Sequence, residues 1–98
     1  MLRMTIYERP QETSFLVEGR LVGMWVKALE QCWEIGLAAE PSKPVLVTLS
    51  LTALDGEGRD LLTRMRRHGV GLESAGILMQ AIIAEVEKKA QMEELSWV

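Results

Sequence analysis

The stretch VLVTLSLTALDGEGRDLL, residues 45–62, joins an apolar run to an amphipathic run through a short polar hinge. The apolar run, residues 45–54, carries no charge and is rich in leucine and valine, which predicts a central strand covered on both faces of a sheet. After the hinge, apolar residues recur at helical spacing, and the segment closes with basic residues and Gly69, a typical helix C-terminus. The stretch therefore predicts a strand that passes directly into a helix.

Two strands and a helix are predicted upstream of this stretch. Residues 4–8 and 14–18 are rich in β-forming side chains and are separated by the polar segment RPQET, so they predict adjacent strands with a tight connection. From about Leu21, apolar residues recur at three- and four-residue spacing, which predicts an amphipathic helix that ends near Gly36 and before Pro41.

A brief strand and a third helix are predicted downstream. The segment VGLES, residues 70–74, is the strand candidate, and the helix begins at Gly76 with apolar residues around most of its first two turns. The predicted order is β, β, α, β, α, β, α, an α/β sandwich with about four strands in a mixed sheet and about three helices. Residues 1–98 then form one domain, with 90–98 as a helical or flexible tail.

Composition and charge narrow the class of protein. With 98 residues, 48% of them hydrophobic and 26% charged, the chain has the size and composition of a single globular domain. Its net charge of −3 argues against nucleic acid as the main partner. Because Cys32 is the single cysteine and no run of about 20 apolar residues is present, we expect a cytoplasmic protein that does not insert into membranes.

The hinge and its surroundings resemble the STAS domains, a family that includes the anti-sigma factor antagonists of bacterial partner-switching pathways. These domains typically show a turn such as GRLD after the second strand, then a helix, an apolar strand, the segment D-S-x-G-L and a helix that begins L-L. The corresponding segments here are Glu18-Gly19-Arg20-Leu21, the run VLVTLSLTAL, Asp55-Gly56-Glu57-Gly58-Arg59 and Leu61-Leu62. The similarity covers nearly the whole chain and implies a STAS-like sandwich.

Two positions depart from the family pattern. The phosphorylatable Ser or Thr of the family follows the aspartate, and that position is Gly56, which has no hydroxyl group. Thr48 stands where the family often has an acidic residue at the end of the central strand. The resemblance therefore implies a regulatory protein-interaction module, not an enzyme, that binds an anti-sigma factor or a kinase-like regulator and is not phosphorylated at the usual site.

The polar hinge is the predicted docking surface. Asp55 is the expected N-cap of the following helix, Glu57 adds a second carboxylate, and the two glycines allow a tight turn or the close approach of another backbone. We hypothesise that Glu57 supplies permanently the negative charge that phosphorylated relatives gain conditionally. The alternative is that DGEG is only a well-capped strand-to-helix connection. The partner-binding candidates are Asp55, Gly56, Glu57, Gly58, Arg59 and Leu62.

A second predicted surface involves the third helix and the tail. Met79, Ile83 and Val86 form an apolar stripe on the helix, and Leu95 and Trp97 lie in the tail. A helix that is apolar on most sides needs more than one surface to pack against, which favours a homodimer or partner interface. The alternative is that the tail folds back over its own sheet. A structural homodimer, or one that carries a small apolar ligand, is the corresponding alternative function.

The chain offers few groups for catalysis or metal binding. Asp55, Glu57 or Asp60 could act as an acid or base, so a small acid/base enzyme is a further alternative. Cys32 and His68 fall on different predicted helices, and the Walker and G-x-G-x-x-G patterns are absent, so we expect no metal and no cofactor.

Basic residues gather in the second predicted helix, whereas the C-terminal part of the chain is acidic. These opposite charges could meet between subunits or bind an acidic partner, or the basic group could be a solvated face at a helix C-terminus. The basic residues are Arg59, Arg64, Arg66 and Arg67.

Overall fold

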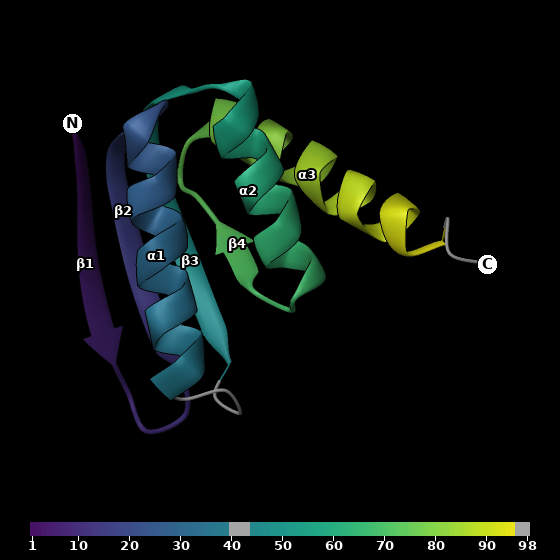
Figure 1. Ribbon diagram of the computed structural model, residues 1–98. Coiled ribbons are helices and arrows are strands. Elements are labelled where there is room, and N and C mark those ends of the chain that lie inside the picture. The colour runs from purple at the N-terminus through teal and green to yellow at the C-terminus, as the bar shows by residue number, and fades with distance from the viewer. Residues whose placement is uncertain (40–43, 96–98) are drawn as a thin grey trace.

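The computed structural model describes residues 1–39 and 44–95, which form four strands and three helices (Figure 1). Their order, β-β-α-β-α-β-α, confirms the predicted α/β fold with a mixed sheet. The elements are β1 (Leu2–Glu8), β2 (Thr13–Leu21), α1 (Met24–Ala39), β3 (Val45–Leu54), α2 (Gly56–Arg67), β4 (Gly71–Glu73) and α3 (Ile77–Leu95).

The strands form one sheet in the order β1-β2-β3-β4. β1 and β2 are antiparallel, and β3 runs parallel to both β2 and β4. Parallel neighbours need a crossover connection, which α1 and α2 supply, and both crossovers step in the same direction across the sheet. The two helices consequently lie side by side on one face, and both begin at the edge where Leu21 of β2 lies opposite Leu54 of β3 (Figure 1).

The hydrophobic core lies between this face of the sheet and the helices. Val17, Val47 and Leu49 alternate along β2 and β3 and are at most 1% exposed. They belong to one cluster with Leu29 of α1 and Leu61 of α2, which are equally buried. Each such side chain contributes about 1.5–3 kcal/mol through its removal from water.

The opposite face of the sheet is not covered by a helix in the described part of the chain (Figure 1). Thr48, Ser50 and Thr52 of β3 point to this face, and the last two are exposed. The prediction that β3 is covered on both faces is therefore wrong. Its hydroxyl side chains alternate with apolar ones, so the run has the two-residue period of a strand with one buried face, although it carries no charge.

The first helix differs from its predicted limits at both ends. It begins at Met24 because β2 continues to Leu21 and the chain turns at Gly23, whose φ is 53°. It continues through Gly36 to Ala39. A glycine inside a helix costs only about 1 kcal/mol relative to alanine, which the burial of residues such as Trp33 readily offsets.

Candidate functional site

Asp55 holds together the two turns at which α1 and α2 begin. Its Oδ1 accepts a hydrogen bond from the N–H of Gly58 at 2.8 Å, which confirms Asp55 as the N-cap of α2. Its Oδ2 accepts a second hydrogen bond, also 2.8 Å long, from the N–H of Gly23 in the turn between β2 and α1. Sequence reasoning missed this second contact, because Gly23 and Asp55 are neighbours only through the parallel pairing of β2 and β3.

The hydrogen bonds of Asp55 stabilise its ionised form. The N–H of Gly23 and then that of Gly58 lower the pKa of the Asp55 carboxyl group below its ordinary value, since both donors favour the carboxylate. Each carboxylate oxygen is thus occupied by a backbone N–H of the chain itself. Asp55 therefore acts here as a structural residue that fixes the shape of the hinge.

Gly58 is required by close packing. An added Cβ at this position would lie 2.7 Å from the carbonyl oxygen of Leu21 and 2.7 Å from Cδ1 of Leu54. Such contacts are shorter than carbon and oxygen atoms tolerate, so only glycine lets the first turn of α2 approach the end of β2. Gly58 is buried and turns no surface toward a partner.

Gly56 and Glu57 lie on the exposed side of the same turn. A Cβ added at Gly56 would meet no atom within 4 Å, so this position is open to solvent. Glu57 is exposed in the first turn of α2, where its charge opposes the positive end of the helix dipole. Leu62, in contrast, is fully buried in the core, so its assignment as a docking residue is wrong.

Met24 adds an apolar group to the hinge that sequence reasoning missed. It follows Gly23, which is bonded to Asp55, and its side chain is 75% exposed. The available signal was its position outside the apolar stripe of the helix, which continues through the buried Val26 and Leu29. We call Met24, Gly56 and Glu57 together the hinge surface.

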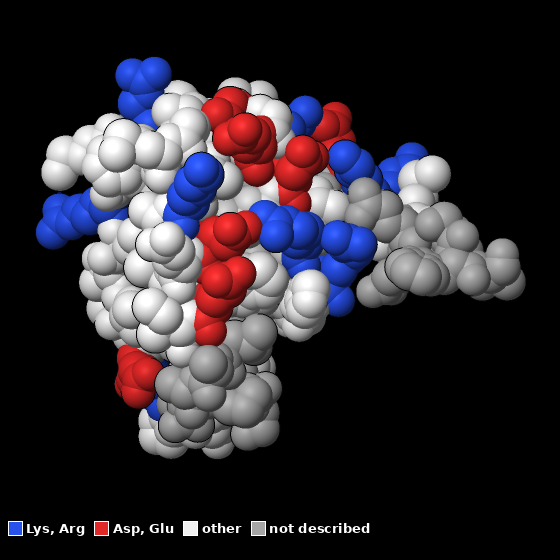
Figure 2. Space-filling model, in the orientation of Figure 1, with Lys and Arg blue, Asp and Glu red and all other residues white. Residues whose placement is uncertain are grey.

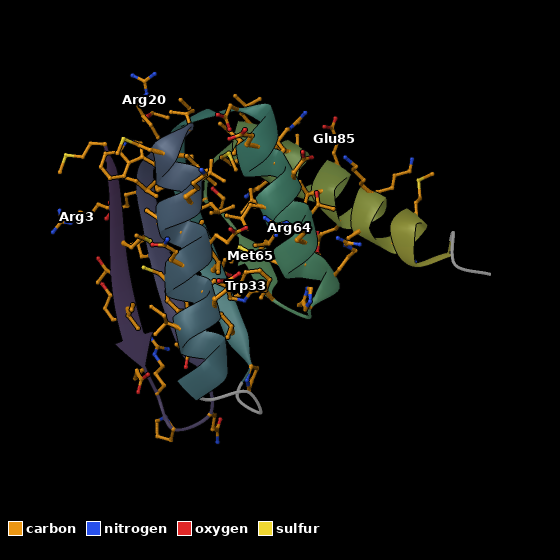
Figure 3. The ribbon with its side chains drawn as sticks, viewed as in Figure 1. Arg3, Arg20, Trp33, Arg64, Met65 and Glu85 are labelled. Carbon is orange, nitrogen blue, oxygen red and sulfur yellow. The ribbon has the colours of Figure 1, made fainter. Side chains whose placement is uncertain are left out.

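Arginines of α2 pair with acidic residues of the neighbouring helices. Figure 2 shows the acidic and basic groups side by side over these helices, and Figure 3 labels Arg64 together with Trp33 and Met65, two members of the core cluster. The opposite charges noted in the sequence thus meet within one chain. All are partly exposed, so each pair is worth about 0–1 kcal/mol. The pairs are Arg64–Glu30 on α1, and Arg59–Glu85 (2.9 Å), Arg66–Glu87 (3.2 Å) and Asp60–Lys89 (3.6 Å) on α3.

A small cleft lies beside the hinge, between α2 and α3. Its volume is about 190 Å³, and its rim includes Gly56 and the Arg59–Glu85 ion pair. Pockets for small organic ligands usually measure about 300–1,000 Å³. The cleft is therefore suited to receive at most a side chain of a partner protein.

The predicted interface on α3 is wrong for Met79, Ile83 and Val86. Met79, Ile83 and Val86 are 8%, 5% and 3% exposed, because this stripe packs into the core beside α2. Leu95 is the last residue of α3, and Trp97 lies outside the described residues.

The lone histidine and cysteine do not form a reactive pair. His68 is the C-cap of α2, and its Nδ1 donates to the carbonyl oxygen of Arg64 at 2.8 Å. Its ring meets that of Trp33 edge to face at 5.4 Å, whereas Cys32 is half-buried on α1.

Over residues 1–39 and 44–95, no group of three or more His, Cys, Asp and Glu side chains is arranged to hold a metal ion. In the same ranges, no helix is both long enough and apolar enough to cross a bilayer.

Comparisons of this chain with protein-family models, with curated proteins and with solved structures return no significant match in any of the three. The resemblance to STAS domains accordingly rests on the motifs around Gly19 and Asp55 quoted above.

Proposed function

We propose that this chain is a non-catalytic interaction module that docks a protein partner through the hinge surface of Met24, Gly56 and Glu57. The resemblance to STAS domains suggests an anti-sigma factor or a kinase-like regulator as the partner. Because Gly56 has no hydroxyl group, docking is not switched by phosphorylation at this position. Glu57 instead provides a permanent charge.

The observation that carries the proposal is an exposed surface on a rigid backbone. Asp55 ties both helix starts together through its 2.8 Å hydrogen bonds to Gly23 and Gly58, which position the backbone from which the side chains of Met24 and Glu57 project. A preorganised surface loses little conformational entropy on binding. Its chemistry fits a partner that offers an apolar contact for Met24 and a cationic group for Glu57.

The acid/base alternative has less support. A general acid or base works best with a pKa near the working pH, whereas the pKa of Asp55 is lowered and both of its oxygens are occupied. Glu57 and Asp60 are both exposed, and the cleft that Asp60 lines measures only about 190 Å³. A surface that excludes so little water favours binding over catalysis.

The test is capture of a partner from native cell extract by the immobilised protein and by single variants. Met24→Glu and Glu57→Lys alter exposed side chains and leave the hydrogen bonds of Asp55 intact. Ile35→Glu is the matched control, because Ile35 is also exposed, at 71%, but lies near the other end of α1.

A protein retained by the wild type and by Ile35→Glu, and lost with Met24→Glu and Glu57→Lys, supports the proposal and names the pathway. With the purified partner, each hinge substitution is expected to cost about 1–2 kcal/mol, or about five- to thirtyfold in Kd. If the same proteins bind all four forms equally, the hinge surface is not the docking site. Circular dichroism melts confirm that each variant is folded.

A further inference from the structure

β1 offers a long free edge at one side of the sheet. It spans seven residues, Leu2–Glu8, and in the described part of the chain it pairs with β2 alone. The strand at the other side, β4, has only three residues. Natural sheets usually blunt their edges with short strands, charged side chains (lysine above all), proline or bulges. β1 contains neither lysine nor proline, its two charged residues, Arg3 and Glu8, lie toward its ends, and its register with β2 is regular throughout.

The hydrogen-bond pattern shows which backbone groups of β1 face this edge. The N–H of Arg9 donates to the carbonyl of Glu12, and the N–H of Arg20 donates to the carbonyl of Met1, both at 3.0 Å. Because bonding alternates along an antiparallel pair, odd-numbered residues of β1 bond to β2 and even-numbered residues direct their N–H and C=O groups outward. The outward groups belong to Leu2, Met4, Ile6 and Glu8.

Apolar side chains flank the free edge on both faces of the sheet. Ile6 lies on the helix-covered face, opposite Phe15 of β2, and is 54% exposed. Tyr7 lies on the open face and is 48% exposed. Arg3, also on the open face, projects outward from β1 (Figure 3).

We propose that β1 pairs antiparallel with β1 of a second copy of this chain, about a two-fold axis that passes through Thr5. Backbone bonding requires even-numbered residues to face even-numbered residues, and the register that uses the whole strand places Leu2 opposite Glu8 and Met4 opposite Ile6. Residues paired in this way keep their side chains on the same face. The four strands of each copy then form one continuous sheet with all helices on one side.

The side chains of β1 complement one another in this register. On the open face Arg3 of one copy lies opposite Tyr7 of the other, where the guanidinium group can stack on the aromatic ring, and Thr5 faces its own copy. On the helix-covered face Met4 meets Ile6. No charged side chain lies opposite a like charge.

This self-complementarity favours a second copy over an unrelated strand. A two-fold interface requires a surface that matches itself, and symmetry makes each favourable pair, such as Arg3 with Tyr7, occur twice. A register shifted by two residues leaves two of the seven residues unpaired and places Ile6 or Met4 opposite itself. The whole-strand register is therefore the one that we test.

The first experiment measures molar mass by light scattering over about a hundredfold range of protein concentration. The wild type is expected to approach twice the 11.0 kDa of the single chain. Ile6→Lys places two cations close to the axis and is expected to raise the dissociation constant at least about tenfold. Ile77→Lys, the same substitution at a residue of α3 that is 86% exposed, is expected to leave the mass unchanged.

The second experiment tests the register with a disulfide in a Cys32→Ser background. In the proposed pair, position 5 and its copy form a non-hydrogen-bonded pair with Cα atoms about 4.5 Å apart, so Thr5→Cys should oxidise to a covalent dimer. Arg3 and its copy lie four residues apart along the strands, about 14 Å, so Arg3→Cys should form no disulfide-linked dimer under the same conditions.

A wild type that stays at 11.0 kDa throughout the range, or an Ile6→Lys variant that associates as tightly as the wild type, would overturn the proposal. Equal cross-linking at positions 3 and 5 would refute the whole-strand register. The proposed function is refuted by a different result, namely that Met24→Glu and Glu57→Lys leave partner binding unchanged. The two proposals are therefore tested separately.

Discussion

Gly58→Ala is expected to destabilise the protein, although alanine is ordinarily the better helix residue. In a helix interior, this substitution stabilises by about 0.5–1 kcal/mol. At Gly58 the new Cβ lies 2.7 Å from Cδ1 of Leu54, which can move, and 2.7 Å from the carbonyl oxygen of Leu21, which belongs to the backbone of β2. Overpacking of this kind costs about 1–3 kcal/mol, so the net loss is about 0–2.5 kcal/mol.

Gly56→Ala is the matched control, two residues earlier in the same helix. Nothing lies within 4 Å of its added Cβ, so the substitution is expected to be neutral or to stabilise by up to about 1 kcal/mol. Urea unfolding followed by circular dichroism measures both variants, and each kcal/mol corresponds to about 4–8 °C in Tm for a domain of this size. If Gly58→Ala raises the stability as much as Gly56→Ala, the close approach of α2 to β2 is refuted.

Three further substitutions test the remaining assignments. Because the pKa of Asp55 is lowered from its ordinary 3.8, its contribution to stability is fully present above that pH and disappears as the pH falls through the lower folded value. Asp55→Asn should remove this part of the acid dependence. Urea midpoints of the wild type that stay unchanged between about pH 6 and pH 2 would contradict this role of Asp55. Leu62→Ala should cost about 2–5 kcal/mol in urea unfolding, as a fully buried side chain does, whereas a loss within about 0.5 kcal/mol would place Leu62 on the surface. Arg64→Ala should cost no more than about 1 kcal/mol at low salt and less at high salt, since its pair with Glu30 is partly exposed; a larger, salt-independent loss would show a different role.

The hinge shows which contacts a local sequence pattern can predict and which it cannot. Asp55 as an N-cap follows from its position between an apolar run and an amphipathic one, because capping involves only residues within one helical turn. Its second hydrogen bond, to Gly23, crosses 32 positions of the chain and depends on how β2 and β3 are paired. For the same reason, Gly56 and Gly58 look equivalent in the sequence, yet one is open to solvent and the other is enclosed.

The sequence by itself determined the number, type and order of the elements, because periodicity, capping and turn residues act over a few positions. Only the tertiary structure decided which apolar surfaces are available. Leu62 and the stripe of Met79 and Ile83 were expected to be interfaces, but they are core residues, since α3 packs beside α2 and both helices contribute to the same core. Within residues 1–39 and 44–95, the strand order leaves the outer edge of β1 unpaired, and strand order depends on contacts between residues far apart in the chain.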